Sequence, residues 1–106
     1  MAVDTVPASK ASKRENRYSF RLKDGGKVYS VPKLQYMSGD GSKFIAEQLG
    51  KGLDEVSFTR RLLSIECPEA AAELDSLHAD QVLWLSERWT AASAITVGES
   101  EGSAES

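Results

Sequence analysis

Two residues in this chain of 106 amino acids, His78 and Cys67, have side chains that often carry out catalysis or bind metals. A zinc site needs several ligands at short, regular spacings, and His78 has no cysteine or acidic residue at such a spacing. A serine hydrolase of the elbow type needs a Gly-x-Ser-x-Gly sequence, which the chain lacks. We therefore expect His78 to begin a helix, and we predict no metal site, no cofactor and no enzymatic activity.

Cys67 directly precedes Pro68, at the expected start of a helix. A helix N-terminus can lower the pKa of a thiol, although a plain buried cysteine or cap is the simpler interpretation. As the single cysteine, Cys67 excludes an internal disulfide and agrees with a reducing compartment. The stretch GDGSKF (residues 39–44) lacks the spacing of a phosphate-binding loop and is interpreted as a capped turn.

The clearest structural pattern is a β-hairpin that begins at Arg17. Apolar residues alternate with polar ones in RYSFRLK, which is the two-residue period of a half-buried strand. The sequence Asp24-Gly25-Gly26 provides the positive φ angles of a tight turn. The stretch KVYSV is rich in β-branched and aromatic residues and forms the return strand, up to Pro32.

Three or four short helices are expected after the hairpin. The first runs to Leu49, is capped by Asp40 or Ser42, and ends at Gly50 or Gly52. Its inward-facing residues are expected to be Phe44, Ile45 and Leu49. The next helices are expected at about 53–66, 68–77 and 79–92. The fold class is therefore α+β and mostly helical, with a single domain at 17–93.

Both termini lack an apolar period. Residues 1–16 are predicted to be a disordered basic arm, and residues 94–106 a flexible acidic tail or linker. Residues 1–33 carry a net charge of +5, and residues 34–106 carry −8. This dipolar distribution allows head-to-tail self-association and differs from that of a uniformly basic nucleic-acid binder. Because no apolar run approaches the length of a membrane helix or signal peptide, we expect a cytosolic protein.

The helix at 53–66 carries apolar residues on two roughly opposite sides. One stripe contains Leu53, Val56 and Leu63, and the other contains Phe58, Leu62 and Ile65. In the last helix, Trp84 lies off the apolar stripe and near Arg88. Either the hairpin covers the second stripe, or an exposed apolar strip is available for self-association or a partner. The candidate partner-binding residues are Phe58, Leu62, Ile65, Trp84 and Arg88.

Two stretches covering about half of the chain carry a family pattern. The first, YSFRLKDGGKVYSVPKL, is a hairpin running into Val-Pro-Lys-Leu, and the second is LDSLHADQVLWLSERWTAASAITVGESEGSAES. They resemble the opening and the C-terminal part of the tail assembly chaperones of long-tailed bacteriophages. The matching C-terminal positions are Leu74, Leu77, Gln81, Trp89, Ser93, Val97, Gly98, Glu99 and Ser100. His78 departs from this pattern, where a Thr or Ser cap is expected.

The resemblance implies a chaperone that binds the tape measure protein, keeps its apolar helices soluble and helps tail tube subunits polymerise around it. It also implies a longer product, made by a programmed frameshift, with an extra domain that recruits the tail tube protein. Residues 94–106 would be a linker in that product, and an ordinary frayed terminus is the alternative. Such chaperones act in the cytoplasm of the bacterial host and are absent from the mature virion.

Two other functions stay open on the sequence. The basic arm and the hairpin could serve a small DNA-binding or regulatory protein, whose affinity would fall steeply with salt. The chain could also be a structural virion component, such as a head–tail connector or a tail subunit.

Overall fold

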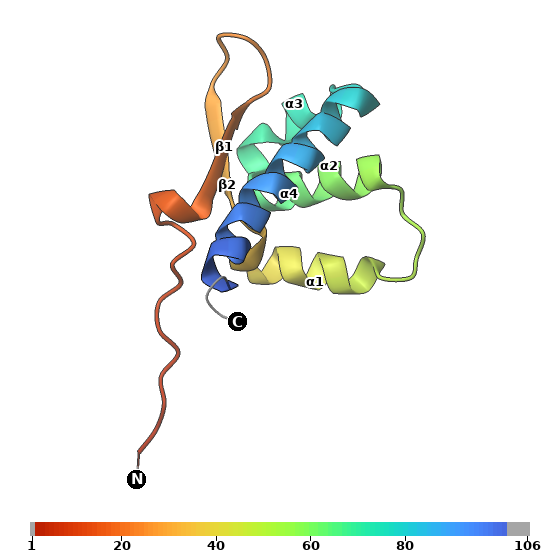
Figure 1. Cartoon of the computed structure of the whole chain (residues 1–106). Helices are drawn as coiled ribbons and strands as arrows, with labels where there is room; N and C mark the ends of the chain where they lie inside the picture. Colours follow the sequence, from red (N-terminus) through yellow and green to blue (C-terminus); the bar gives the residue numbers. More distant parts are fainter. Residues whose placement is uncertain (1, 102–106) are drawn as a thin grey trace.

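The computed structural model describes residues 2–101, which form an antiparallel hairpin followed by four α-helices (Figure 1). The elements are η1 (Arg14–Asn16), β1 (Arg17–Arg21), β2 (Val28–Pro32), η2 (Leu34–Tyr36), α1 (Gly39–Gln48), α2 (Glu55–Glu66), η3 (Pro68–Ala70), α3 (Ala71–Asp75) and α4 (Ala79–Glu101). This confirms the expected fold class, α+β and mostly helical.

The hairpin has one buried face, as its alternating sequence predicts. Phe20 lies opposite Tyr29, and Tyr18 lies opposite Val31, so that these four side chains share the face that packs on the core. The connection is longer than a two-residue turn, because β1 ends at Arg21 and β2 starts at Val28. Within this loop the Gly26 N–H donates to the Lys23 carbonyl (3.0 Å), and Gly25 adopts a φ of 72°. Glycine suits that left-handed position because it has no Cβ.

Helix α1 begins at Gly39, two residues earlier than a cap at Asp40 would place it and four earlier than a cap at Ser42 would. Ser38 is the N-cap, since its hydroxyl accepts a hydrogen bond from the Gly41 N–H at 3.0 Å. The expectation that Leu49 faces inward is wrong, because its side chain is 75% exposed. Leu49 follows the last helical residue with an extended backbone, and the left-handed Gly50 then turns the chain away.

Helix α2 begins at Glu55, two residues later than expected, because the carboxylate of Asp54 accepts from the Ser57 N–H (3.0 Å) and caps the helix. After α2, Pro68 occupies the first position of η3, where its missing N–H has no helical partner to lose. The η3 turn leads directly into α3, as expected for the stretch PEAAAELDSL.

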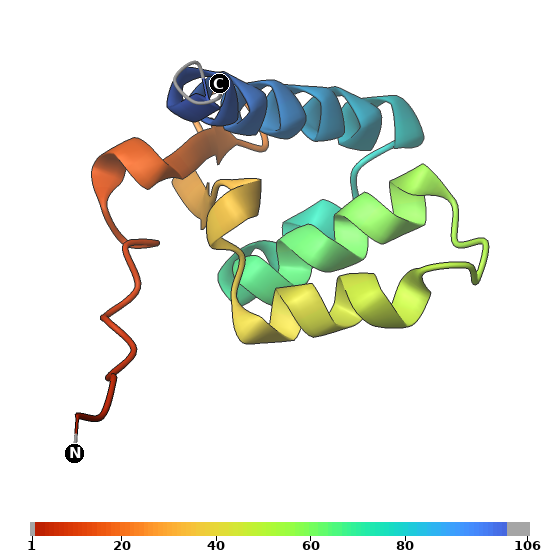
Figure 2. The same cartoon turned by 60° about the horizontal axis from the view of Figure 1, so that its bottom comes forward.

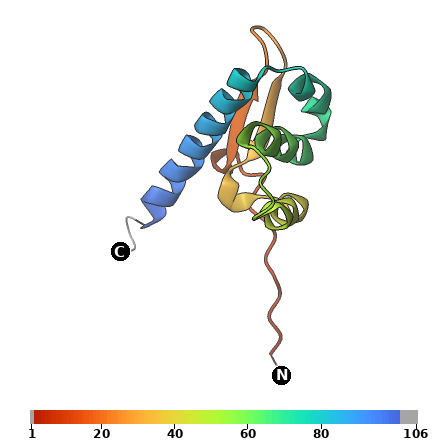
Figure 3. The ribbon, with the colours of Figure 1, turned by 90° about the vertical axis from the view of Figure 1, so that its right-hand side faces the viewer.

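Helix α2 lies between α1 and α4 (Figure 2). Figure 3 shows the hairpin with α4 towards one side and with α2 and α3 towards the other. Side chains from all of these elements meet in one core: Phe20, Tyr29, Val31, Phe44, Leu62, Leu63, Cys67, Ala70, Leu74, Leu85 and Trp89.

Regular structure or hydrogen bonds extend into both terminal segments, 1–16 and 94–106. Helix α4 continues to Glu101, beyond its expected end at about Ala92, since no proline interrupts it and Gly98 alone costs only about 1 kcal/mol in a helix. Of the tail assigned to 94–106, the last five residues lie outside the described range. In the arm, residues 2–9 have no regular structure, but Asn16 is buried and its amide donates to the Lys10 carbonyl at 2.9 Å.

Candidate interaction site

Trp84 is the most conspicuous surface side chain of α4, because it is 54% exposed. The same helix buries Val82, Leu85 and Trp89 against the rest of the molecule. The Arg88 guanidinium lies 5.2 Å from the centre of the Trp84 ring, within the range of a cation–π contact. The structure therefore brings Trp84 and Arg88 together at the surface, as the sequence pattern predicts for these two residues.

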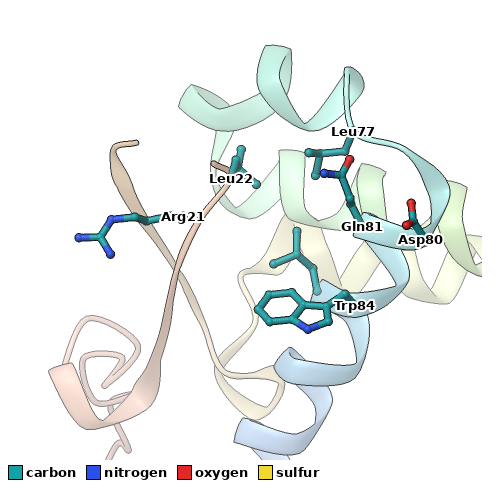
Figure 4. A pocket seen from close by; sticks show the side chains of 7 residues that line it. Arg21, Leu22, Leu77, Asp80, Gln81 and Trp84 are labelled. Carbon is teal, nitrogen blue, oxygen red and sulfur yellow. The ribbon is translucent and has the colours of Figure 1, made fainter. Parts of the chain in front are cut away.

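Trp84 borders two adjoining hollows. One, of about 300 Å³, lies between the end of β1 and the first turns of α4, where Leu22, Leu77 and Trp84 converge (Figure 4). The other, of about 580 Å³, follows β1 and the hairpin loop from Ser19 to Asp24. Val28, at the start of β2, also lines it and is 50% exposed. We call Leu22, Leu77 and Trp84 the Trp84 surface.

The charges around this surface are mixed. Arg21 and Asp80 line the first hollow, and Lys23 and Asp24 line the second. In Figure 4 the Arg21 side chain points away from Trp84, to the other side of β1. Its guanidinium donates to the Gly26 carbonyl at 3.2 Å, which links the strand to its own loop. The Trp84 surface is thus an apolar patch with a polar rim, the usual composition of a protein-binding site.

The three candidate residues on α2 do not join Trp84. Leu62 is only 3% exposed, and Ile65 packs on the core from a partly buried position. The Phe58 ring stacks on Phe44 of α1, with 5.4 Å between the ring centres. Of the two alternatives for the second stripe of α2, an exposed strip does not hold at Leu62, because the core and α1 cover that side of the helix.

The orientation of Trp84 depends on how α4 is anchored to the hairpin. The Trp89 indole N–H donates to the Pro32 carbonyl (3.0 Å), and the Ser93 hydroxyl accepts from the Leu34 N–H (2.9 Å). At 3.6 residues per turn, Trp84 lies about 140° around the helix from Trp89 and so faces outward. Sequence reasoning missed this anchor, although a buried tryptophan N–H generally needs an acceptor.

The start of α4 is held by Gln81 and Arg60. The Gln81 carboxamide accepts from the His78 N–H at 2.8 Å, which is one half of a capping box. The bond satisfies the backbone N–H of the cap residue, His78. A Thr or Ser side chain at the same position would instead accept from a donor inside the first turn of the helix. The Arg60 guanidinium donates to the carbonyls of Leu74 and Leu77, and so ties α2 to the end of α3 and to the turn before α4. His78 thus begins a helix, as expected.

Cys67 is a buried side chain of the core, with 5% exposure. Burial and the nearby Glu69 carboxylate raise the pKa of its thiol, which is the opposite of the lowering that a helix start could produce.

Across residues 2–101, no three or more His, Cys, Asp or Glu side chains are grouped so that they could hold a metal ion. Over the same range no helix has both the length and the apolar run needed to cross a bilayer.

Comparison with family models, with curated proteins and with solved structures found no match to this chain.

Proposed function

We propose that this protein is a non-enzymatic chaperone of bacteriophage tail assembly. In this role it binds the tape measure protein, keeps it soluble and promotes assembly of the tail tube around it. The family resemblance suggests this function, and two of the positions that carry it contact the N-terminal segment. Pro32 and Leu34 of the Val-Pro-Lys-Leu segment hydrogen-bond to Trp89 and Ser93 of the C-terminal segment. This packing gives the two separated stretches a common structural role, which supports treating them as one pattern.

The observation that carries the proposal is the exposure of Trp84 beside Leu22 and Leu77. A chaperone for apolar helices needs an apolar contact area on an otherwise polar body. A large aromatic side chain in such an area is the residue type that most often dominates binding energy. We assign client contact to the Trp84 surface, and Phe58, Leu62 and Ile65 have no part in it.

Arg88 extends this contact area. With its guanidinium over the Trp84 ring, it covers part of the indole face and keeps donors available for carbonyl or carboxylate groups of a bound segment. Arginine and tryptophan are both enriched where proteins bind one another.

The proposed function also implies a location, the host cytoplasm, and a second partner, the tail tube protein. The chaperone acts in the cytoplasm of the bacterial host and leaves before the virion is complete. A longer frameshifted form would recruit the tail tube protein, with residues 94–106 as the linker.

The test is co-expression with the tape measure protein that is encoded downstream, with its soluble fraction as the readout. We expect this chain to increase the soluble fraction and to co-purify with the client. Trp84→Asp should weaken this binding by at least about 30-fold, since a hot-spot residue contributes about 2 kcal/mol or more. Leu49→Asp is the matched control, because Leu49 is an exposed apolar residue in the α1–α2 loop.

Three outcomes would contradict the proposal. A client that stays insoluble with both the short chain and the longer product would argue against a chaperone. The presence of the protein in purified particles would favour a virion component. Salt-dependent DNA binding that needs the arm or hairpin cations would favour a DNA-binding protein. Loss of client binding in Leu49→Asp but not in Trp84→Asp would keep the function and move the contact to the α1–α2 loop.

A further inference from the structure

Strand β1 has an open edge. The sheet has two strands, and on the side of β1 away from β2 none of the described residues forms a third (Figure 1). The Lys33 N–H donates to the carbonyl of Asn16 (2.9 Å), which lies directly opposite it when the hairpin register is extended. In an antiparallel pair every second pair of residues exchanges hydrogen bonds, and the pairs between them point their backbone groups outward.

Ser19 and Arg21 fall on those outward-pointing positions, and both residues are exposed. Pro32 falls on the same set, where its missing N–H removes no bond between the strands. On the β2 side, the outward carbonyl of Pro32 is taken by Trp89. On the β1 side, Ser19 and Arg21 both line the hollow of about 580 Å³. This edge has the geometry that an additional strand requires.

The same chain contains a segment suited to form that strand. Residues 2–9 have no regular secondary structure and are exposed, with Val3 at 80% and Val6 at 88%. Val3, Thr5 and Val6 are β-branched residues, which favour extended backbone. Pro7 then limits the strand, since it cannot donate to a ladder. Eight extended residues reach about 26 Å, enough to contact another molecule.

Hydrogen bonds at the root of this arm hold it away from its own β1. The Asn16 amide donates to the Lys10 carbonyl at 2.9 Å, and the Arg17 guanidinium donates to the Ala11 carbonyl at 3.1 Å. The arm leaves the body at the start of β1 and points away from the hairpin (Figure 1). To lie along its own β1, the arm would have to reverse its direction next to these bonds.

We propose that residues 2–9 of one copy add as a strand to the β1 edge of a second copy. Charge favours this occupant, because Asp4 of the arm would come near Arg21 and Lys23 beside the edge. Pairing of β1 with β1 of a second copy would instead bring these cations close to their own counterparts, which is unfavourable. Since the arm and the edge are different surfaces, each copy can donate to one neighbour and accept from another.

The experiment measures the mass of the full chain by sedimentation equilibrium between about 10 μM and 1 mM, without any client. We expect the mass of the unmodified protein to rise with concentration. The arm variant Val3→Lys with Val6→Lys should associate at least tenfold more weakly. The charge added at position 6 lies on the face of Asp4, beside Arg21 and Lys23, and the change at position 3 removes a β-branched apolar side chain from the other face. Leu49→Lys with Leu53→Lys is the matched control, since it adds the same charge at exposed leucines elsewhere.

A mixing experiment identifies the two halves of the contact. Ser19→Pro removes an outward N–H and blocks the edge, while its own arm stays intact. Mixed with the arm variant, which keeps an open edge, it should form 1:1 pairs that neither variant forms alone. Should Ser19→Pro not fold, amide exchange gives a second measurement. The Ser19 and Arg21 amides should gain protection with concentration in the unmodified protein but not in the arm variant.

Three results would overturn the proposal. The first is a mass that stays monomeric up to 1 mM. The second is an arm variant that associates as tightly as the unmodified protein. The third is a monomer in which the Ser19 and Arg21 amides are already protected from exchange. The last result would mean that the arm lies on its own edge. Because the assay contains no client and leaves Trp84 unchanged, its failure would leave the chaperone proposal standing.

Discussion

The indole N–H of Trp89 donates a hydrogen bond of 3.0 Å to the carbonyl of Pro32, 57 positions earlier in the chain. Pro32 ends β2 at a position whose carbonyl points away from β1, and Trp89 is 3% exposed. This bond joins the last helix to the hairpin and so sets which side of α4 faces the solvent.

Removal of this bond should destabilise the protein. Trp89→Phe keeps an aromatic ring but leaves the buried Pro32 carbonyl without its donor, so we expect a loss of about 1–3 kcal/mol in the free energy of unfolding. The measurement is urea unfolding followed by circular dichroism. Trp84→Phe is the control, since that ring is half-exposed, and it should change stability by no more than about 0.5 kcal/mol. Equal effects of the two substitutions would contradict the assigned role of Trp89.

Two glycines of α1 should respond differently to alanine. A Cβ at Gly41 would collide with the Glu66 carboxylate and lie 2.7 Å from Met37 Cγ, while a Cβ at Gly39 would meet open space. The Glu66 carboxylate accepts hydrogen bonds from the N–H (3.2 Å) and the hydroxyl (2.8 Å) of Ser38. Alanine normally stabilises a helix relative to glycine by up to about 1 kcal/mol.

We therefore expect Gly39→Ala to be neutral or slightly stabilising. Gly41→Ala should cost about 1–3 kcal/mol, because it displaces Glu66 from Ser38. Thermal and urea unfolding of the two variants give the comparison. A stabilised Gly41→Ala would show that Glu66 and Met37 move aside without loss.

Alkaline pH should test the contact between Tyr29 and Glu73. The hydrogen bond that the Tyr29 hydroxyl donates to the Glu73 carboxylate raises the pKa of Tyr29 to about 12. Since the unfolded value is about 10, the stabilisation from this group is complete below pH 10 and is lost as the pH rises towards 12. The stability difference between the unmodified protein and Tyr29→Phe should shrink over that window.

Chemical unfolding at several pH values from 8 to about 12 measures this difference. Tyr36→Phe, in η2, is the control for the general effect of removing a tyrosine hydroxyl. A difference for Tyr29→Phe that stays constant up to pH 12 would contradict the hydrogen bond to Glu73.

Leu62 should behave as a core residue. Because it is 3% exposed, Leu62→Ala should cost about 2–5 kcal/mol in the free energy of unfolding. Leu53→Ala, at a leucine that is 42% exposed, should cost less than about 1 kcal/mol. Urea unfolding compares the two, and a mild effect at Leu62 would reopen the interpretation of that side of α2 as a surface.

Local sequence signals were sufficient for the elements of the fold. The alternation of Tyr18, Phe20 and Leu22 predicts the hairpin, because side chains alternate between the faces of a strand. Pro68 predicts the break between α2 and α3, because its ring and missing N–H act within one turn. The place of Trp84 off the apolar stripe of α4 also follows from helical periodicity alone.

Other features depend on residues far apart in the chain, and the tertiary structure decided them. Phe58 is covered because α1 brings Phe44 against it, and Ser38 caps α1 while it binds Glu66. A periodicity shows that a helix has two apolar sides, but burial requires a neighbour that only the packed chain provides. The sequence by itself therefore determined the hairpin, the helices and the off-stripe tryptophan, and packing determined which apolar side chains stay at the surface.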